Sequence, residues 1–321
     1  MTLASRPIAL TIGVFDGLHR GHQAIVGATV AAARGFGGAA WVATFDPHPD
    51  AVVRGSAPRP WITPPEERAA LLHALGVDRV EVVRFDREVQ ALTPEGFLDR
   101  VLGPEAPLRA LVVGPDFRMG KDRVGDRAYL EALGARRGFA VREVPFLVGP
   151  PGSAGTSGAG AAGPKLSSTL LRKAIEEGRV QDAAEIMGRS YSLEGMVGSG
   201  AGRGTELGYP TANLELGPQK LLPAPGIYVS LNKLSSTSHP GITYVGSAGT
   251  FGPGPVRVEV HLFDFAGSLR GKSLKTLLIE RLRADKVFES SEDLVRAMDA
   301  DLALAKARWA EIRSGGAIGT A

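Results

Sequence analysis

The sequence predicts an α/β protein of two domains, in which a doubly wound parallel sheet is followed by a small antiparallel β-barrel with a C-terminal helix. In the first half, short apolar runs alternate with helical stretches, as in sheets whose strands are connected by helices. In the second half, apolar runs follow one another with Gly- and Pro-rich turns between them, which favours a small barrel. Between the halves, residues 149–164 consist of Gly, Ala, Pro, Ser and Thr, a composition typical of a flexible loop.

The elements of the first half are expected to alternate between strand and helix. Strands are predicted at residues 8–14, 40–45, 80–85, 110–114 and 141–146. Helices are predicted at residues 23–33, from a capping box at Thr63–Glu66 to Gly76, from Thr93, and at 129–137. Because parallel sheets bind ligands at the carboxyl ends of their strands, we expect a site in the loops that follow these strands.

The second half begins after a helix predicted at residues 167–177 and closed by Gly178. Strands are predicted at 191–197, 227–231, 242–245 and 256–265. A last helix starts at Ser290, and its apolar residues recur at helical spacing, so it should pack on the barrel. We expect one domain over 1–188, a second over 189–313, and a flexible tail over 314–321.

Composition excludes several classes of protein. The chain has 321 residues and no cysteine, which rules out disulfides, thiolate metal sites and cysteine nucleophiles. The 37 basic and 34 acidic residues leave a net charge of +3, too small an excess to predict a nucleic-acid partner. No apolar stretch approaches the roughly 18 residues of a membrane span, and no secretory signal is evident. A cytoplasmic protein is expected, and the oligomeric state stays open.

The first candidate site follows the first predicted strand, at Gly13–His22. A strand–loop–helix junction offers backbone N–H groups and the positive end of a helix dipole, which suit phosphate. His19 and His22 can both face one phosphate oxygen and donate to it as charge shifts. The alternative is that two surface histidines begin a helix and bind nothing.

Three further segments of the same half carry polar side chains after predicted strands or at a helix start. His48 stands between two prolines after the second strand, and Asp116 follows the fourth strand. Ser168, Thr169 and Arg172 start a helix and suit a second phosphate clamp. Each segment has a structural alternative: a rigid turn for the first two and a simple helix cap for the third.

The second half holds a different set of groups. A Gly-rich segment, 200–208, leads into Tyr209-Pro210-Thr211-Ala212-Asn213. On an extended chain the Thr211 and Asn213 side chains point to the same side, and their neutral oxygens suit a magnesium ion that bridges phosphates. Glu259 lies in an otherwise apolar strand, where it can act as a general base or face water as an ordinary barrel residue.

These motifs together resemble the prokaryotic bifunctional riboflavin kinase/FAD synthetase (FMN adenylyltransferase) family. The likeness lies in six segments that follow the family order: Gly13–His22, Thr44–Pro49, Gly114–Gly120, Ser167–Arg172, Gly208–Asn213 and Val258–His261. Six motifs in order are specific, whereas each alone is weak. The segment Gly246–Phe251 lacks the proline common in the family, which puts a substrate loop of the kinase half in doubt.

The resemblance implies a Rossmann-like nucleotidyltransferase domain that makes FAD from FMN and ATP, and a barrel that makes FMN from riboflavin and ATP with Mg²⁺. It implies catalytic roles for Glu259, His19 and His22, and a metal held by Thr211 and Asn213. The residues implied to bind nucleotide or phosphate are Gly13, Phe15, Asp16, Gly17, His48, Asp116, Ser168, Thr169, Arg172, Gly202, Arg203, Gly208 and Pro210. The alternatives are one inactive site, or a flavin carrier on the same scaffold.

Overall fold

The computed structural model describes residues 6–103, 107–149, 163–198, 208–217, 219–247 and 256–315. The chain divides into two compact units, residues 1–150 with 162–168 and residues 151–161 with 169–321. The predicted boundary at 188/189 lies downstream of this division, because α7 (Ser168–Glu176) and α8 (Val180–Met187) group almost entirely with the second unit. The functional boundary at 188/189 stays a prediction.

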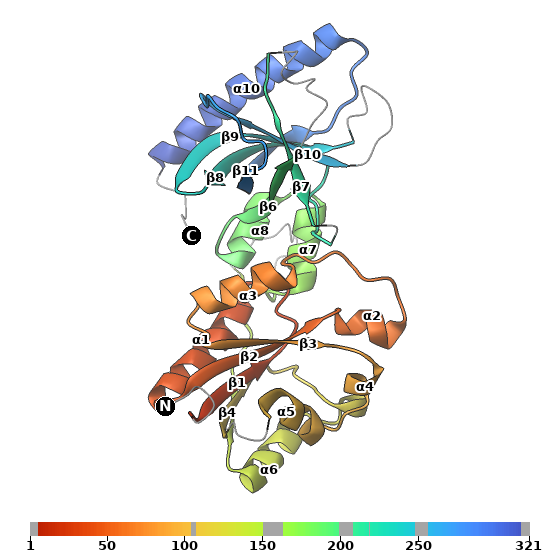
Figure 1. The fold of residues 1–321 in the computed structure, drawn as a ribbon, viewed down its shortest axis with the longest axis vertical. Coiled ribbons are helices and arrows are strands. Elements are labelled where there is room, and N and C mark those ends of the chain that lie inside the picture. The colour runs from red at the N-terminus through yellow and green to blue at the C-terminus, as the bar shows by residue number, and fades with distance from the viewer. Residues whose placement is uncertain are drawn as a thin grey trace. The chain divides into compact units, whose positions relative to one another are not determined.

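The first unit is a five-stranded parallel sheet with the strand order β3-β2-β1-β4-β5 (Figure 1). The strands are β1 (Ile8–Ile12), β2 (Ala39–Asp46), β3 (Arg79–Arg84), β4 (Leu108–Val113) and β5 (Ala140–Glu143). The helices are α1 (Arg20–Gly35), α2 (Pro49–Arg54), α3 (Pro65–Ala74), α4 (Arg87–Gln90), α5 (Pro94–Leu102) and α6 (Arg127–Arg137). The predicted doubly wound fold is confirmed, and the strand order reverses between β1 and β4, where such sheets bind ligands.

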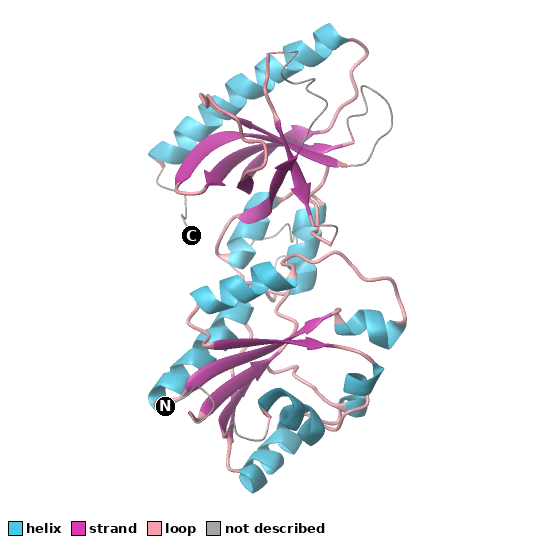
Figure 2. Cartoon of the chain, viewed as in Figure 1, coloured by secondary structure: helices cyan, strands magenta, loops and turns pink. Residues whose placement is uncertain are grey.

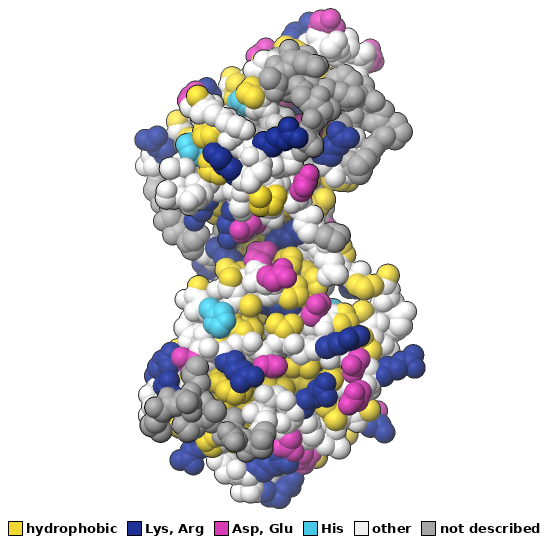
Figure 3. Space-filling model, in the orientation of Figure 1, with side chains coloured by type: hydrophobic (Ala, Val, Ile, Leu, Met, Phe, Trp, Pro, Cys, Tyr) yellow, Lys and Arg dark blue, Asp and Glu magenta, His cyan; other side chains and the backbone are white. Residues whose placement is uncertain are grey.

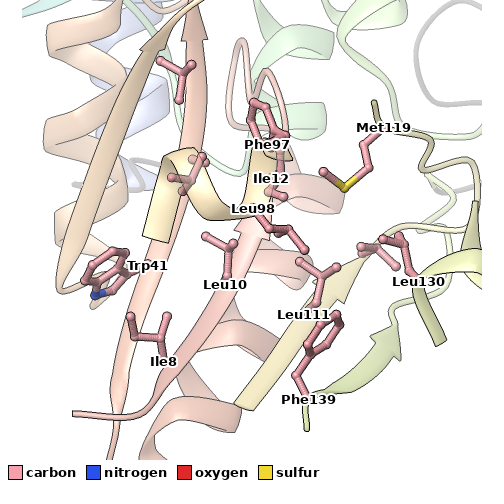
Figure 4. Close-up of a cluster of buried hydrophobic side chains, with 14 of the residues drawn as sticks. Ile8, Leu10, Ile12, Trp41, Phe97, Leu98, Leu111, Met119, Leu130 and Phe139 are labelled. Atoms are coloured by element: carbon pink, nitrogen blue, oxygen red, sulfur yellow. The ribbon is translucent and has the colours of Figure 1, made fainter. Parts of the chain in front are cut away.

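The alternation of side chains along β1 explains why helices cover both faces of this sheet. Ile8, Leu10 and Ile12 pack against Phe97 and Leu98 of α5 and against α6, a cluster that Figure 4 shows. Ala9, between them, faces the opposite way and packs against alanines of α1. Both faces are therefore buried, which explains why the strand is a continuous apolar run.

The second unit is a closed barrel with the strand order β10-β7-β6-β11-β8-β9. Its strands are β6 (Tyr191–Gly198), β7 (Ala212–Leu216), β8 (Gly226–Leu234), β9 (Thr237–Gly246), β10 (Arg257–Leu262) and β11 (Ser273–Ala284). All its pairings are antiparallel, as predicted (Figure 2). The final helix α10 (Ser291–Ser314) is capped by Ser290 and packs on β8 and β9 through Ala305, Leu302 and Trp309.

Two details differ from the sequence predictions. The strands β7 and β11 and the helices α2, α4 and α8 were not expected. The predicted capping box at Thr63 is wrong, because the N-cap of α3 is Pro64 and no side chain caps it. The Thr63 hydroxyl accepts a hydrogen bond from the Gly17 N–H instead. Most of the Gly/Ala-rich loop and of the predicted tail lies outside the described residues.

The surfaces of both units carry mixed charge. On the face that Figure 3 shows, basic and acidic side chains alternate over each unit, as the small net charge suggests. Among the described residues no helix is long and apolar enough to cross a membrane.

Candidate active sites

The loop between β1 and α1 makes a tight turn with left-handed backbone. Phe15, Gly17 and Leu18 have φ angles of 53°, 79° and 40°. The two non-glycine residues fit because their side chains are buried, so packing offsets the backbone strain. The loop places His19 at the N-cap of α1, three residues before His22.

The two predicted histidines meet at the start of α1. Their rings stack with centroids 3.7 Å apart and planes inclined by 23°. His19 Nδ1 accepts a hydrogen bond from the His22 backbone N–H at 3.3 Å, which leaves the proton of the neutral ring on Nε2. Gly21 allows the close approach, because a Cβ there would lie 3.0 Å from His19 Cε1. The structure therefore places two imidazoles together at a helix N-terminus.

The pKa of His22 lies well below its ordinary value of 6.5. Desolvation is the largest cause, followed by repulsion from His19 and from Arg68 of α3. The ring of Phe15 packs edge-on against His22 at 5.2 Å and contributes to that desolvation. At neutral pH the His22 imidazole is uncharged, so it can donate one N–H to a phosphate oxygen.

Several residues predicted to cradle the nucleotide also support the loop. The N–H of Gly13 donates to the Ala43 carbonyl at 3.0 Å, and the N–H of Gly17 donates to Thr63 Oγ1 at 2.8 Å. These two N–H groups therefore have partners within the protein. Phe15 is buried against His22, where it orients the ring.

Asp16 and Thr63 hold the loop to the segment before α3. The Thr63 N–H donates to Asp16 Oδ1 at 2.9 Å, and both residues are buried. The Asp16 carboxylate therefore holds the backbone of the loop, and its role in binding nucleotide or phosphate stays a prediction. Sequence reasoning missed Thr63 as part of this site, because a Thr followed three residues later by Glu is also the signature of a helix cap.

The remaining candidates of the first unit lie on neighbouring loops. His48 caps the short helix α2, since its Nδ1 accepts from the Asp50 N–H at 3.1 Å, and its ring lies 5.5 Å from Trp61. Asp116 forms a 2.6 Å ion pair with Lys165. Both follow strands of the sheet at the carboxyl edge, as predicted.

The helix start at Ser168 is tied directly to the histidine loop. Ser168 Oγ donates to the carbonyl oxygen of Asp16 at 2.9 Å. Thr169 and Arg172 belong to the second compact unit. Arg172 Nη1 lies 4.0 Å from Glu176 Oε1, one turn further along α7.

In the barrel, the three predicted oxygen-bearing residues lie together. Asn213 on β7 is paired in register with Glu259 on β10, and the Thr211 hydroxyl donates to Glu259 Oε2 at 3.2 Å. All three side chains are half-buried, whereas Ala212, Val258 and Val260 between them are buried inside the barrel. The alternation of the two strands places the three on one face.

The backbone before Thr211 is held from two sides. His261 Nδ1 donates to the Pro210 carbonyl at 2.9 Å, and the Tyr209 hydroxyl donates to Asp299 of α10. Gly208 has a φ of +88°, a conformation that favours glycine. Gly202 and Arg203, predicted to bind phosphate, lie outside the described residues, as does most of the departure at Gly246–Phe251.

A cavity of about 250 Å³ opens beside Thr211. Its walls come from the ends of β6, β7 and β10 and from the loop after β10, and the described lining is Val197, Gly198, Pro210, Thr211, Ala212, Val260, Leu262, Phe265, Gly267, Ser268, Leu269 and Arg270. A cavity lined by both apolar and polar groups, next to the Thr211 hydroxyl, suits a ligand that carries a ring and phosphates.

Fold and sites together define a class of two-part transferases that act on nucleotide phosphates. Residues 2–149 match the family model described as FAD synthetase, and residues 187–309 match the one described as riboflavin kinase. The chain belongs to the bifunctional riboflavin kinase/FMN adenylyltransferase family.

Relatives of that name align over nearly the whole chain. The relative from Pseudomonas fluorescens is 33% identical over 94% of this chain and 93% of its own. The relative from Escherichia coli K12 is 32% identical over 89% and 87%. A solved structure from Streptococcus pneumoniae, described as a macrolide-efflux protein, aligns with a TM-score of 0.77 and 28% identity over 92% of each chain.

Proposed function

We propose that this chain carries out both reactions of its family: the barrel phosphorylates riboflavin to FMN, and the parallel-sheet unit adenylylates FMN to FAD. The observation that carries the proposal is that one chain keeps two separate clusters, the stacked histidines at α1 and the Thr211–Asn213–Glu259 cluster. ATP is the second substrate at both sites.

In the kinase reaction, Glu259 is the general base. Its carboxylate takes the proton of the ribityl 5′-hydroxyl, that oxygen forms a bond to the γ-phosphorus of ATP, and the bond from the γ-phosphorus to ADP breaks. The Thr211 hydroxyl orients the carboxylate through its 3.2 Å hydrogen bond. The cavity beside Thr211 includes the apolar side chains of Val260, Leu262 and Phe265, which suit a planar ring of either substrate.

The barrel cluster also fits Mg²⁺. Hydroxyl, amide and carboxylate oxygens are the donors that this ion prefers, and Thr211 can donate its proton to Glu259 while its oxygen lone pairs remain available. When bound, the ion would neutralise charge on the ATP phosphates. Among the described residues no group of three or more His, Asp or Glu side chains could hold a metal. Thr211 and Asn213 are the proposed ligands because their neutral oxygens lie beside Glu259.

In the adenylylation reaction, an oxygen of the FMN phosphate attacks the α-phosphorus of ATP, and pyrophosphate leaves. That phosphate is already ionised, so the site needs positioning and charge stabilisation and no general base. His19 and His22 donate N–H groups to the α-phosphate as its charge shifts. Ser168, Thr169 and Arg172 are proposed to bind the leaving phosphates, and His48 and Asp116 to border the nucleotide.

The test is a time course of the purified chain with riboflavin, ATP and Mg²⁺, followed by chromatography. FMN should appear first and FAD after it. An absence of FMN would contradict the proposal. Product that stops at FMN would support the alternative of one competent site, and bound flavin without ATP consumption would support a carrier.

A further inference from the structure

Arg68 is a buried cation that hydrogen-bonds to the loop carrying the histidine pair. It lies on α3, and its side chain has no exposed area. An arginine on a helix at the protein surface normally keeps its charged end in water, and full burial of that end is costly unless it has partners.

The partners of Arg68 are backbone carbonyls of two different loops. Nη1 donates to the Val14 carbonyl and Nη2 to the Phe45 carbonyl, each at 2.9 Å. Val14 lies between β1 and His19, and Phe45 lies near the end of β2, ahead of His48. The guanidinium also lies 4.5 Å from the ring centroid of Trp61. One side chain therefore joins the carboxyl ends of two neighbouring strands.

The hydrogen-bond partners of Arg68 are neutral carbonyl groups. Within the described part of the chain its hydrogen bonds go to the two carbonyls and to no carboxylate, and its Nε is buried without a partner. Asp16 and Asp46 are the acidic groups that act on it electrostatically. A positive charge held in this way, in surroundings of low polarity, acts strongly on nearby groups.

The histidines are among those groups. His22 contacts the rings of Phe15 and His19, and the charge of Arg68, which hydrogen-bonds to the loop ahead of the histidines, acts on it electrostatically. Both His19 and Arg68 lower the pKa of His22, so they favour its neutral form. The positive charge that attracts an incoming phosphate then comes from Arg68, because an arginine side chain keeps its proton at neutral pH.

We propose that Arg68 is a positioning residue for adenylyl transfer, which locks the histidine loop to the end of β2 and supplies the fixed positive charge that acts on His22. The part of this inference that concerns the reaction rate rests on the proposed function of the site. The electrostatic part concerns His22 and can be measured without turnover.

The experiment compares full-length wild type with Arg68→Gln, which removes the charge, and Arg68→Lys, which keeps it. An NMR titration of histidine-labelled protein, with the His22 signal assigned from His22→Asn, measures the pKa of His22. We expect that pKa to rise toward its ordinary range in Arg68→Gln and to stay low in Arg68→Lys. A His22 pKa that is the same in both variants and in wild type would overturn the proposal.

Kinetics of FAD formation from FMN provide the second measurement. Arg68→Gln should lower kcat at least tenfold and move the acid limb of the pH profile to higher pH, because the neutral form of His22 is lost earlier on acidification. In Arg68→Lys the acid limb should lie at the same pH as in wild type, because the charge is kept. Its kcat should still be below that of wild type, because lysine lacks the two-pronged guanidinium group that binds both carbonyls. An Arg68→Gln enzyme with the wild-type rate and profile would also overturn the proposal.

Controls separate this proposal from misfolding and from failure of the proposed function. Riboflavin phosphorylation by the same chains should be unchanged. Arg100→Gln, at an exposed arginine of α5 that pairs with Glu88 at 3.7 Å, should leave adenylylation unchanged. If Arg68→Gln does not fold, the titration and kinetics of Arg68→Lys test the proposal instead. A raised pKa of His22 in Arg68→Lys, or a rate of adenylylation equal to that of wild type, would contradict the proposal. Wild type without adenylylation would refute the proposed function, while the titration still tests Arg68.

Discussion

The stacked histidines at the start of α1 depend on a residue with no side chain. At Gly21 a Cβ would lie 3.0 Å from His19 Cε1 and 3.1 Å from its Nδ1, so any larger residue must displace the ring. The glycine therefore has a specific reason to be in a helix, where it otherwise costs roughly 0.5–1 kcal/mol relative to alanine.

Gly21→Ala should separate activity from stability. We expect the rate of FAD formation from FMN to fall about tenfold or more, because small misplacements of catalytic groups are costly. Gly27→Ala in the same helix is the matched control, since a Cβ there meets nothing within 4 Å. It should raise the melting temperature slightly and leave the rate unchanged. Equal rates in the two variants would contradict the role given to Gly21.

The residues of the site were only partly predictable from sequence. Motif order predicted that His19 and His22 lie together, and likewise Thr211, Asn213 and Glu259, since loops after strands and side-chain alternation follow from local pattern. The roles of Thr63 and Arg68 did not follow, because both form long-range hydrogen bonds to the loop after β1. Locally, Thr63 resembles a helix cap and Arg68 an ordinary helix arginine.

At the scale of elements, the segment Tyr209–Thr211 is the link between β7 and α10. The Tyr209 hydroxyl donates to Asp299, while His261 holds the next carbonyl. The pKa of Tyr209 is raised, with the hydrogen bond to Asp299 as the largest cause. The bond should hold Thr211 in place against Glu259.

Tyr209→Phe removes this bond and keeps the ring. We expect kcat/KM for riboflavin phosphorylation to fall roughly 2- to 10-fold, the size of one hydrogen bond, while FAD formation from FMN is unaffected. Asp299→Ala should have a similar effect, and the double variant should add little. Additive losses in this cycle would show that the two residues act separately.

Tyr228 should make the stability of the barrel depend on pH in the alkaline range. The residue is fully buried on β8, and desolvation raises its pKa from 10.0 to about 12. The unfolded chain therefore releases the proton first, so the free energy of unfolding should fall by about 2–3 kcal/mol between pH 10 and 12. Chemical unfolding at a series of pH values should show a shallower loss in Tyr228→Phe. Equal slopes would contradict this account.

Helices and strands were predicted correctly where the amino-acid composition and the spacing of apolar residues indicate the same structure. The capped helix α10 and the β-rich runs of the first sheet have the side chains that their structures prefer. The strand β11 was missed because its sequence, rich in Leu, Lys, Glu and Arg, favours a helix in isolation. Pairing with β6 and β8 makes it a strand, and the closed barrel requires it.

At the scale of the whole molecule, two chemistries occupy two folds. Phosphorylation of an alcohol needs a base, the role proposed for Glu259, whereas attack by an ionised phosphate needs fixed hydrogen-bond donors, the role proposed for the two histidines. The order of reactions joins them, because the product of the barrel is the acceptor of the parallel-sheet unit. The two proposed sites are therefore expected to be separate and complete within one chain.

The most direct test of this claim is to mix two variants that each lack one site. Glu259→Gln should lose about 10²–10⁴-fold in FMN formation but still make FAD from supplied FMN, and His22→Asn should make FMN but little FAD. From riboflavin and ATP, an equal mixture of the two should form FAD, while each alone should not. Loss of both activities in either folded variant, or a mixture that forms no FAD, would contradict the claim.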